Sequence, residues 1–123
     1  MTKLKKILIA EDDRSLLSAL QEKFTNEGFS VVTAVDGEEG LIVAEKEKPD
    51  LFLLDIRMPK IDGIVMARKL KEKGINAPII FLTNLDDLKN ISDATEVSKS
   101  DYLIKSDWSL KDIVKKVAAK LGE

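Results

Sequence analysis

The feature that most constrains the fold of this sequence is a regular alternation between short apolar runs and segments with helical periodicity. Five runs have the length and composition of strands: KILIA (6–10), SVVTAV (30–35), LFLLD (51–55), PIIFLT (78–83) and DYLIK (101–105). Three of them have an unbroken apolar core, which is typical of strands covered on both faces, as in a parallel sheet. Five such strands alternating with helices predict an α/β fold with a doubly wound parallel sheet.

Five helices are expected around these strands, and the last has the clearest pattern. Apolar residues recur with a 3.6-residue period from Leu110 to Leu121, Ser109 is the expected N-cap, and Gly122 follows the end. The other helices are expected from Leu16 to a stop at Gly28, over 38–47, from Met66 to near Gly74, and over 85–99, where the pattern is weakest. No repeat, linker or low-complexity tract interrupts the chain, so residues 1–123 are expected to form one domain without a separate effector domain.

The chain contains neither His nor Cys. Imidazole bases, His-activated nucleophiles, thiolate chemistry and zinc–sulfur sites are therefore excluded for these residues. The net charge of −2, from 20 basic and 22 acidic residues, shows no bias toward nucleic acid or an anionic membrane. No apolar stretch is long enough for a signal peptide or a bilayer span. A cytoplasmic protein with no direct nucleic acid binding and no membrane partner is expected.

Polar side chains follow the apolar runs at the points where ligands bind in a doubly wound sheet, beyond the carboxyl ends of the strands. They are Glu11, Asp12 and Asp13 after 6–10, Asp55 at the end of 51–55, Thr83 at the end of 78–83, and Lys105 at the end of 101–105. Each alone has an ordinary structural explanation, such as an acidic helix start, a strand terminator or a solvated lysine. Their arrival at one rim of the sheet favours a shared function.

The residue types at this rim indicate phosphoryl transfer with a divalent cation. Crowded carboxylates repel one another unless a cation lies among them, and ligands that are all oxygen favour Mg²⁺, Ca²⁺ or Mn²⁺ over zinc. Asp55 would attack phosphorus, while Lys105, the cation and the Thr83 hydroxyl would stabilise the charge on the transferred group.

The sequence resembles the response regulator receiver domain of two-component signalling, the chemotaxis-regulator-like fold, over essentially all 123 residues. The matching segments are ILIAEDD, DLFLLDIRMPKIDG, PIIFLTN and DYLIKSD. The resemblance implies a flavodoxin-like, five-stranded parallel sheet in the order 2-1-3-4-5 with five helices.

The resemblance also implies a role for each matching residue of the metal site. Asp55 would be the phosphoacceptor, and Glu11 and Asp12 the acidic pair that binds Mg²⁺ together with Asp55. Arg57 would supply its backbone carbonyl to the metal.

Three further residues match the switch of such domains. Thr83 and Lys105 would contact the phosphoryl group, and Tyr102 would be the aromatic residue that rotates with the switch. A partner histidine kinase or His phosphotransfer protein would donate the phosphoryl group. The surface formed by the fourth helix, the fifth strand and the fifth helix would change shape, bind a downstream protein and offer a face for homodimer formation on activation. Such a domain modifies itself and is not a turnover enzyme.

The sequence departs from the family pattern at Ser106, where Pro is usual, at Asn84, where a small residue is usual, and at Ser98-Lys99, where Gly-Ala is frequent. These departures leave open a receiver-like interaction module that works without phosphorylation.

Two other functions fit less well. An Asp-nucleophile phosphohydrolase needs a second Asp where Arg57 stands, and a nucleotide or flavin binder needs a phosphate-cradling loop where Glu11, Asp12 and Asp13 would repel phosphate.

Overall fold

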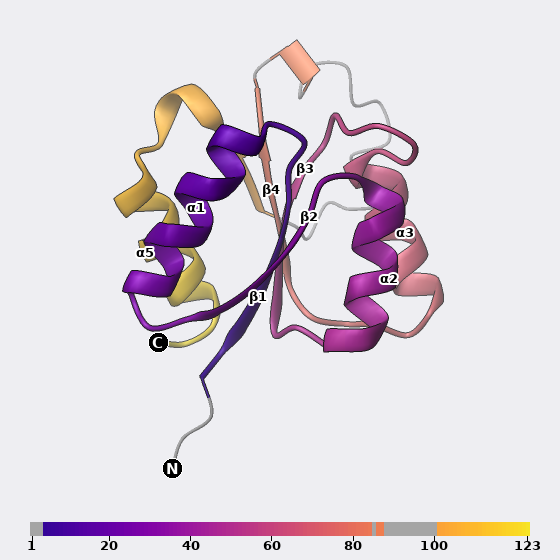
Figure 1. The fold of residues 1–123 in the computed structure, drawn as a ribbon, viewed down its shortest axis with the longest axis horizontal. Coiled ribbons are helices and arrows are strands. Elements are labelled where there is room, and N and C mark those ends of the chain that lie inside the picture. Colours follow the sequence, from indigo (N-terminus) through magenta and orange to yellow (C-terminus); the bar gives the residue numbers. More distant parts are fainter. Residues whose placement is uncertain (1–3, 85, 88–100) are drawn as a thin grey trace.

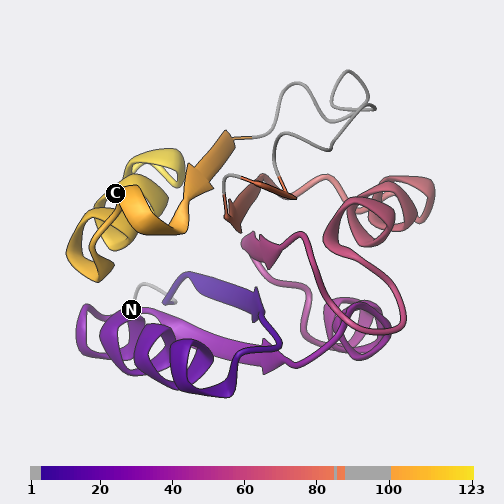
Figure 2. The ribbon, with the colours of Figure 1, turned by 90° about the horizontal axis from the view of Figure 1, so that it is seen from above.

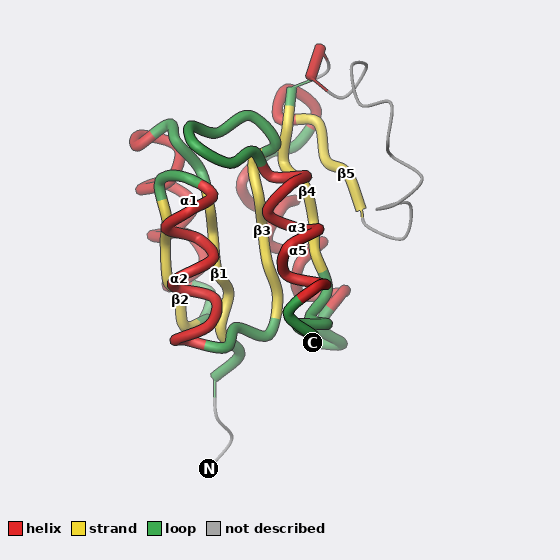
Figure 3. The backbone as a smooth tube through the Cα atoms, turned by 90° about the vertical axis from the view of Figure 1, so that its right-hand side faces the viewer, coloured by secondary structure: helices red, strands yellow, loops and turns green. Residues whose placement is uncertain are grey.

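The five strands form one parallel sheet in the order β2-β1-β3-β4-β5, as Figure 3 shows from the side. The computed structural model describes residues 4–84, 86–87 and 101–123. The strands are β1 (Lys6–Ala10), β2 (Ser30–Ala34), β3 (Leu51–Asp55), β4 (Ile79–Thr83) and β5 (Asp101–Ile104). The predicted fold class and strand order are confirmed.

Helices cover both faces of this sheet (Figures 1 and 2). They are α1 (Arg14–Asn26), α2 (Gly37–Glu47), α3 (Gly63–Glu72) and α5 (Leu110–Lys120). The α1 and α5 helices lie on one face, and α2 and α3 lie on the other. The helix expected over 85–99, with Ser98-Lys99 at its end, lies outside the described residues apart from Asp86 and Asp87, which are helical. In the described part of the chain, no helix has the length and apolarity needed to cross a membrane.

Two apolar cores result from the alternation of side chains along each strand. Ile7 and Ile9 of β1 point toward α1 and α5, where Phe24 and Val117 belong to the same cluster. Leu8 of β1 points the other way. The cluster on that side also contains Ala10, Phe52, Phe81, Met66 and Leu70. Because both faces are covered, strands of this sheet must be apolar at consecutive positions, which explains the unbroken runs in the sequence.

Side-chain caps fix where each helix begins. Asp13, Asp36, Asp62 and Ser109 accept hydrogen bonds from backbone N–H groups in the first turns of α1, α2, α3 and α5, respectively. The predicted Ser109 cap is confirmed. Such caps satisfy donors that the helix itself leaves unpaired.

Two strands end one residue earlier than the sequence predicts. The Val35 N–H donates to the Glu39 carboxylate at 3.2 Å and takes no part in the strand. The β5 strand pairs with β4 only as far as Ile104 opposite Thr83, because β4 ends there. Lys105 therefore starts a short 3₁₀ helix, Lys105–Asp107, instead of ending a strand.

Gly63 allows the start of α3 to lie directly against the end of β3. Its N–H donates to the Ile56 carbonyl at 2.7 Å, and a Cβ at this position would lie 2.2 Å from the backbone carbonyl oxygen of Asp55. A side chain at Gly63 would therefore displace the backbone that carries the Asp55 carboxylate.

We expect Gly63→Ala to lower the free energy of unfolding by roughly 1–3 kcal/mol, because a methyl group there overlaps backbone that cannot move independently. Urea denaturation measures the change. Gly40→Ala is the matched control, since its Cβ would meet the end of the unbranched Met66 side chain, 2.7 Å from Cε, and not backbone. Equal losses in the two variants would contradict this explanation.

Candidate functional site

Three carboxylates converge at the carboxyl ends of β1 and β3. These strands pair in register up to Ala10 opposite Leu54, so the residues that follow β1 lie beside Asp55. Glu11, Asp12 and Asp55 each offer a carboxylate oxygen within 4.8 Å of the others. Glu11 and Asp55 are buried, whereas Asp12 is exposed. This all-oxygen set is suited to holding a divalent cation.

Lys105 brings an ammonium group to the two buried carboxylates. Its Nζ lies 2.8 Å from Glu11 Oε1 and 3.2 Å from Asp55 Oδ2. Lys105 follows β5 and Asp55 ends β3, with β4 between these strands in the sheet. The structure therefore places Lys105 beside Glu11 and Asp55, as expected from the strand order.

Thr83 and Tyr102 lie in the neighbouring strands. Thr83 ends β4 and is fully buried, and its Oγ1 lies 3.5 Å from the Asn84 carbonyl oxygen, the weak end of hydrogen-bonding distance. The Tyr102 ring stacks on Phe81, two residues before Thr83, with ring centroids 5.2 Å apart. The Tyr102 hydroxyl is buried and has no hydrogen-bond partner among the described residues. Burial raises the pKa of Tyr102 above its usual value.

The Arg57 side chain pairs with Asp87 instead of joining the acidic group. Its Nη2 lies 2.5 Å from Asp87 Oδ1, and the Asp87 backbone N–H donates to Asn84 Oδ1 at 2.8 Å. Asn84 thus acts as an N-cap for the helical turn at Asp86 and Asp87, which gives this unusual residue a structural role. Asp87 was not among the residues predicted from the sequence. The spacing Asn84-x-x-Asp87 resembles a capping box and was a signal for the turn, but not for the contact with Arg57.

The environment of Asp55 favours its protonated form. Burial, a hydrogen bond with Glu11 and the Glu11 charge raise the pKa of Asp55 to about 8, although Lys105 acts in the opposite direction. Burial alone would lower the pKa of Lys105. The hydrogen bonds that Lys105 makes with Glu11 and Asp55, together with the negative charges of these residues, raise its pKa above the usual value. Excess negative charge at this rim is therefore only partly balanced by the lysine.

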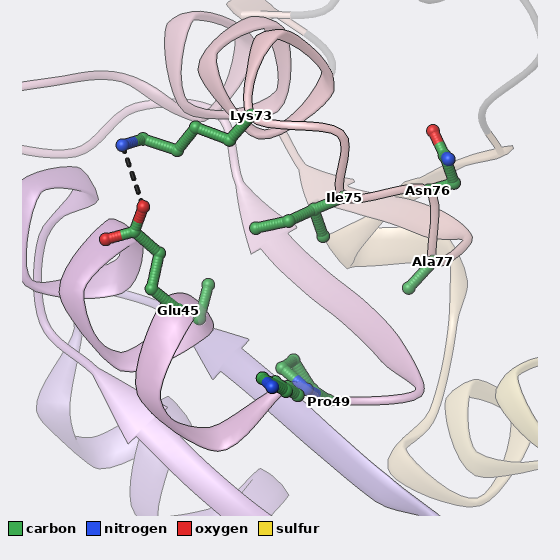
Figure 4. A pocket seen from close by; sticks show the side chains of 8 residues that line it. Glu45, Pro49, Lys73, Ile75, Asn76 and Ala77 are labelled. Carbon is green, nitrogen blue, oxygen red and sulfur yellow. Dashed lines mark hydrogen bonds and ion pairs between the residues drawn. The ribbon is translucent and has the colours of Figure 1, made fainter.

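A hollow of about 420 Å³ lies at the opposite edge of the sheet, between the end of α2 and the loop before β4 (Figure 4). Its lining includes Ala44, Pro49, Ile75 and Ala77, and an ion pair joins Lys73 Nζ to Glu45 Oε1 at 2.8 Å. None of the candidate site residues lines this hollow, so it is separate from the acidic group at the carboxyl ends of the strands.

The raised pKa of Asp55 predicts a pH dependence of stability in the absence of divalent cations. The folded protein keeps the Asp55 proton up to about pH 8, whereas an ordinary Asp loses it near 3.8. The folded state then binds more protons than the unfolded state between these values, so stability falls as the pH rises through this window. The slope from this group is at most about 1.4 kcal/mol per pH unit.

Urea denaturation in EDTA from pH 5 to pH 8 measures this effect. We expect wild type to lose stability more steeply than Asp55→Asn, which cannot titrate at this position. Parallel curves for the two proteins would show that Asp55 is already ionised.

Comparison with protein families identifies residues 7–118 as a response regulator receiver domain. A curated relative, the alkaline phosphatase synthesis transcriptional regulatory protein PhoP of Bacillus subtilis, is 45% identical over 83 residues, which are 68% of this chain and 35% of PhoP. This chain thus spans about a third of the length of that relative.

Solved structures show the same similarity over almost the whole chain. A CheY-like receiver domain protein from Methanospirillum hungatei has a TM-score of 0.87 at 28% identity and covers 98% of this chain and 95% of its own. The CheX–CheY complex of Borrelia burgdorferi with BeF3 and Mg²⁺ contains a chain with a TM-score of 0.80 at 28% identity, covering 94% of this chain and 87% of that one.

These comparisons correct one prediction and establish the family. The expectation of no direct nucleic acid binding is wrong for this group of proteins, because PhoP is a transcriptional regulatory protein. The net charge of −2 that motivated the expectation describes 123 residues, whereas most of PhoP lies outside the matched region. The family model matches residues 7–118, and the structural similarity extends over almost the whole chain. The chain therefore belongs to the response regulator receiver domain family.

Proposed function

We propose that the domain accepts a phosphoryl group on Asp55 from the phosphohistidine of a histidine kinase or His phosphotransfer protein. The observation that carries this proposal is the Lys105 ammonium 3.2 Å from Asp55 Oδ2, beside the carboxylates of Glu11 and Asp12. Such a site has a nucleophile, a fixed cation and ligands for a second cation. Residues 1–123 contain no His, so the phosphohistidine of the donor lies outside these residues.

In the proposed transfer, an Asp55 carboxylate oxygen forms a bond to phosphorus while the phosphorus–nitrogen bond of the donor breaks. The imidazole leaves with the electron pair of that bond. Lys105 donates hydrogen bonds to the oxygens of the transferred group, where negative charge is concentrated. Attack requires the ionised form of Asp55, so the proton favoured by the free site must leave before transfer.

Mg²⁺ is the cation we propose for this site. Glu11, Asp12 and Asp55 would hold it with the backbone carbonyl of Arg57, and it would supply positive charge opposite the phosphoryl oxygens. The fit rests on the exposed Asp12, which brings the acidic group to the surface, and on the Asp55 carboxyl, whose pKa is raised by burial and then by Glu11. The similar Borrelia complex contains BeF3 and Mg²⁺, which supports Mg²⁺ as the cation proposed for this chain.

Phosphorylation would then act as a switch. The new group brings about two negative charges, and the donors available to it are the Thr83 hydroxyl and the Lys105 ammonium. Thr83 is buried, and Phe81, two residues before it in β4, stacks on Tyr102 of β5. A shift of Thr83 would therefore be passed to Tyr102 through β4. The surface formed by β5, α5 and the helix expected over 85–99 would change in response and alter the binding of a downstream protein.

The energies involved are sufficient for this switch. Moving a two-state domain from mostly off to mostly on needs roughly 5 kcal/mol of differential stabilisation. Two or three charge-assisted hydrogen bonds contribute about 1.5–3 kcal/mol each. As a single self-modifying domain, residues 1–123 would catalyse only their own phosphorylation and dephosphorylation. A cytoplasmic location stays a prediction from the sequence.

Intact-mass spectrometry after incubation with acetyl phosphate and Mg²⁺ tests the proposal. We expect one phosphoryl adduct in wild type, none in Asp55→Asn, and none when EDTA removes the cation. A folded wild-type protein that gains no adduct would favour the alternative of an interaction module that works without phosphorylation.

A lysine substitution tests the role of the fixed cation. We expect Lys105→Gln to slow adduct formation by at least about ten-fold, because the transferred group loses a charge-assisted hydrogen bond. Lys6→Gln is the matched control, since Lys6 is equally shielded and also pairs with a glutamate, Glu47, at 3.1 Å, but at the other edge of the sheet. Equal rates in the two variants would exclude Lys105 from the transfer.

A further inference from the structure

The ion pair between Arg57 and Asp87 connects the loop after β3 to the residues after β4. Arg57 lies in the loop after β3, two residues beyond Asp55, and Asp87 lies in the turn after β4, four residues beyond Thr83. The ion pair joins them at 2.5 Å. It therefore ties the position of the proposed phosphoacceptor to the segment that follows the proposed switch hydroxyl.

The burial of the two partners is very unequal. The Arg57 side chain is 75% exposed, whereas the Asp87 side chain is only 8% exposed. Asp87 Oδ2 is buried without a hydrogen-bond partner among the described residues, so Oδ1 carries the contact with Arg57. A buried carboxylate with one unsatisfied oxygen is costly, and without the guanidinium it would favour movement toward water. The arginine thus holds Asp87 in its buried position.

The backbone of Asp87 is joined to the end of β4 through Asn84. Asn84 follows Thr83 directly, and its side chain accepts the Asp87 backbone N–H at 2.8 Å. A movement of Thr83 toward Asp55 would carry this capped turn with it. The Arg57 end would stay in place, because its backbone belongs to the loop that continues from β3 into the packed start of α3.

We propose that the Arg57–Asp87 ion pair is a latch that holds the unphosphorylated conformation and opens when Asp55 is phosphorylated. The inference rests on the proposed function. A phosphoryl group with a charge near −2 is a stronger partner for a guanidinium than a carboxylate is, and it would arrive two residues from Arg57. Competition for the guanidinium releases Asp87, and the turn becomes free to follow Thr83.

The first experiment tests the latch without any phosphorylation. Amide hydrogen exchange is measured by NMR at position 87 in cation-free wild type, Asp87→Asn, Arg57→Gln and the double variant. We expect each single variant to exchange about two- to five-fold faster at this position, the range that one partly exposed ion pair supports. The double variant should be no faster than the single variants, because both remove the same contact. Glu45→Gln, which breaks the ion pair with Lys73 at the opposite edge of the sheet, is the control and should leave position 87 unchanged.

The second experiment tests the coupling to the phosphorylated state. Beryllofluoride with Mg²⁺ is titrated into wild type and Asp87→Asn as a stand-in for the phosphoryl group. Opening the latch by mutation should tighten its binding by the same two- to five-fold factor, because the bound state no longer has to break the ion pair.

The outcomes distinguish the latch from the function on which it rests. Unchanged exchange at position 87, or additive effects in the double variant, would overturn the latch. Equal beryllofluoride affinities in wild type and Asp87→Asn would overturn its coupling to the switch. Failure of wild type to bind beryllofluoride at all would overturn the proposed function itself.

Discussion

The central constraint on this structure is the close approach of buried carboxylates at the carboxyl ends of the strands in a parallel sheet. Glu11 and Asp55 are both buried, and Asp12 lies within 4.8 Å of them at the surface. One ammonium, that of Lys105, contacts the two buried groups. Three acids and one base leave a negative excess that a proton, a metal ion or both must balance. Burial, and after it the neighbouring Glu11, raise the pKa of Asp55, so a cation that enters the site would compete with the Asp55 proton.

The scaffold around this edge keeps the acids together despite their repulsion. The register of β1, β3 and β4 places Glu11, Asp55 and Thr83 at the same edge, and two apolar cores hold the strands from both faces. Gly63 lets α3 begin against the backbone carbonyl of Asp55, and this contact holds the backbone of the acceptor residue in place. Local repulsion at the site is therefore offset by packing elsewhere in the domain, as is usual for functional sites.

Much of this arrangement is readable in the sequence, for physical reasons. Continuous apolar runs mark strands buried on both faces, and residues at the carboxyl ends of parallel strands must meet at one edge, so the sequence alone groups Glu11, Asp55 and Lys105. Side-chain pairings made in loops and turns are different, because no periodicity specifies them. The contact of Arg57 with Asp87 falls in this class, and so does the capping role of Asn84. The link to transcriptional regulators was missed because net charge reports on the residues at hand and not on the partners of a protein family.

Proton release on Mg²⁺ binding tests the central claim most directly. With a pKa of about 8, Asp55 is mostly protonated at pH 7, and a cation bound to the carboxylate displaces that proton. Calorimetric titration with Mg²⁺ at pH 7, in two buffers of different ionisation enthalpy, counts the protons released. We expect wild type to release most of one proton per ion and Asp55→Asn to release almost none. Magnesium binding without proton release in wild type would contradict it, because Asp55 would then be ionised already, despite its burial and the neighbouring Glu11 carboxylate.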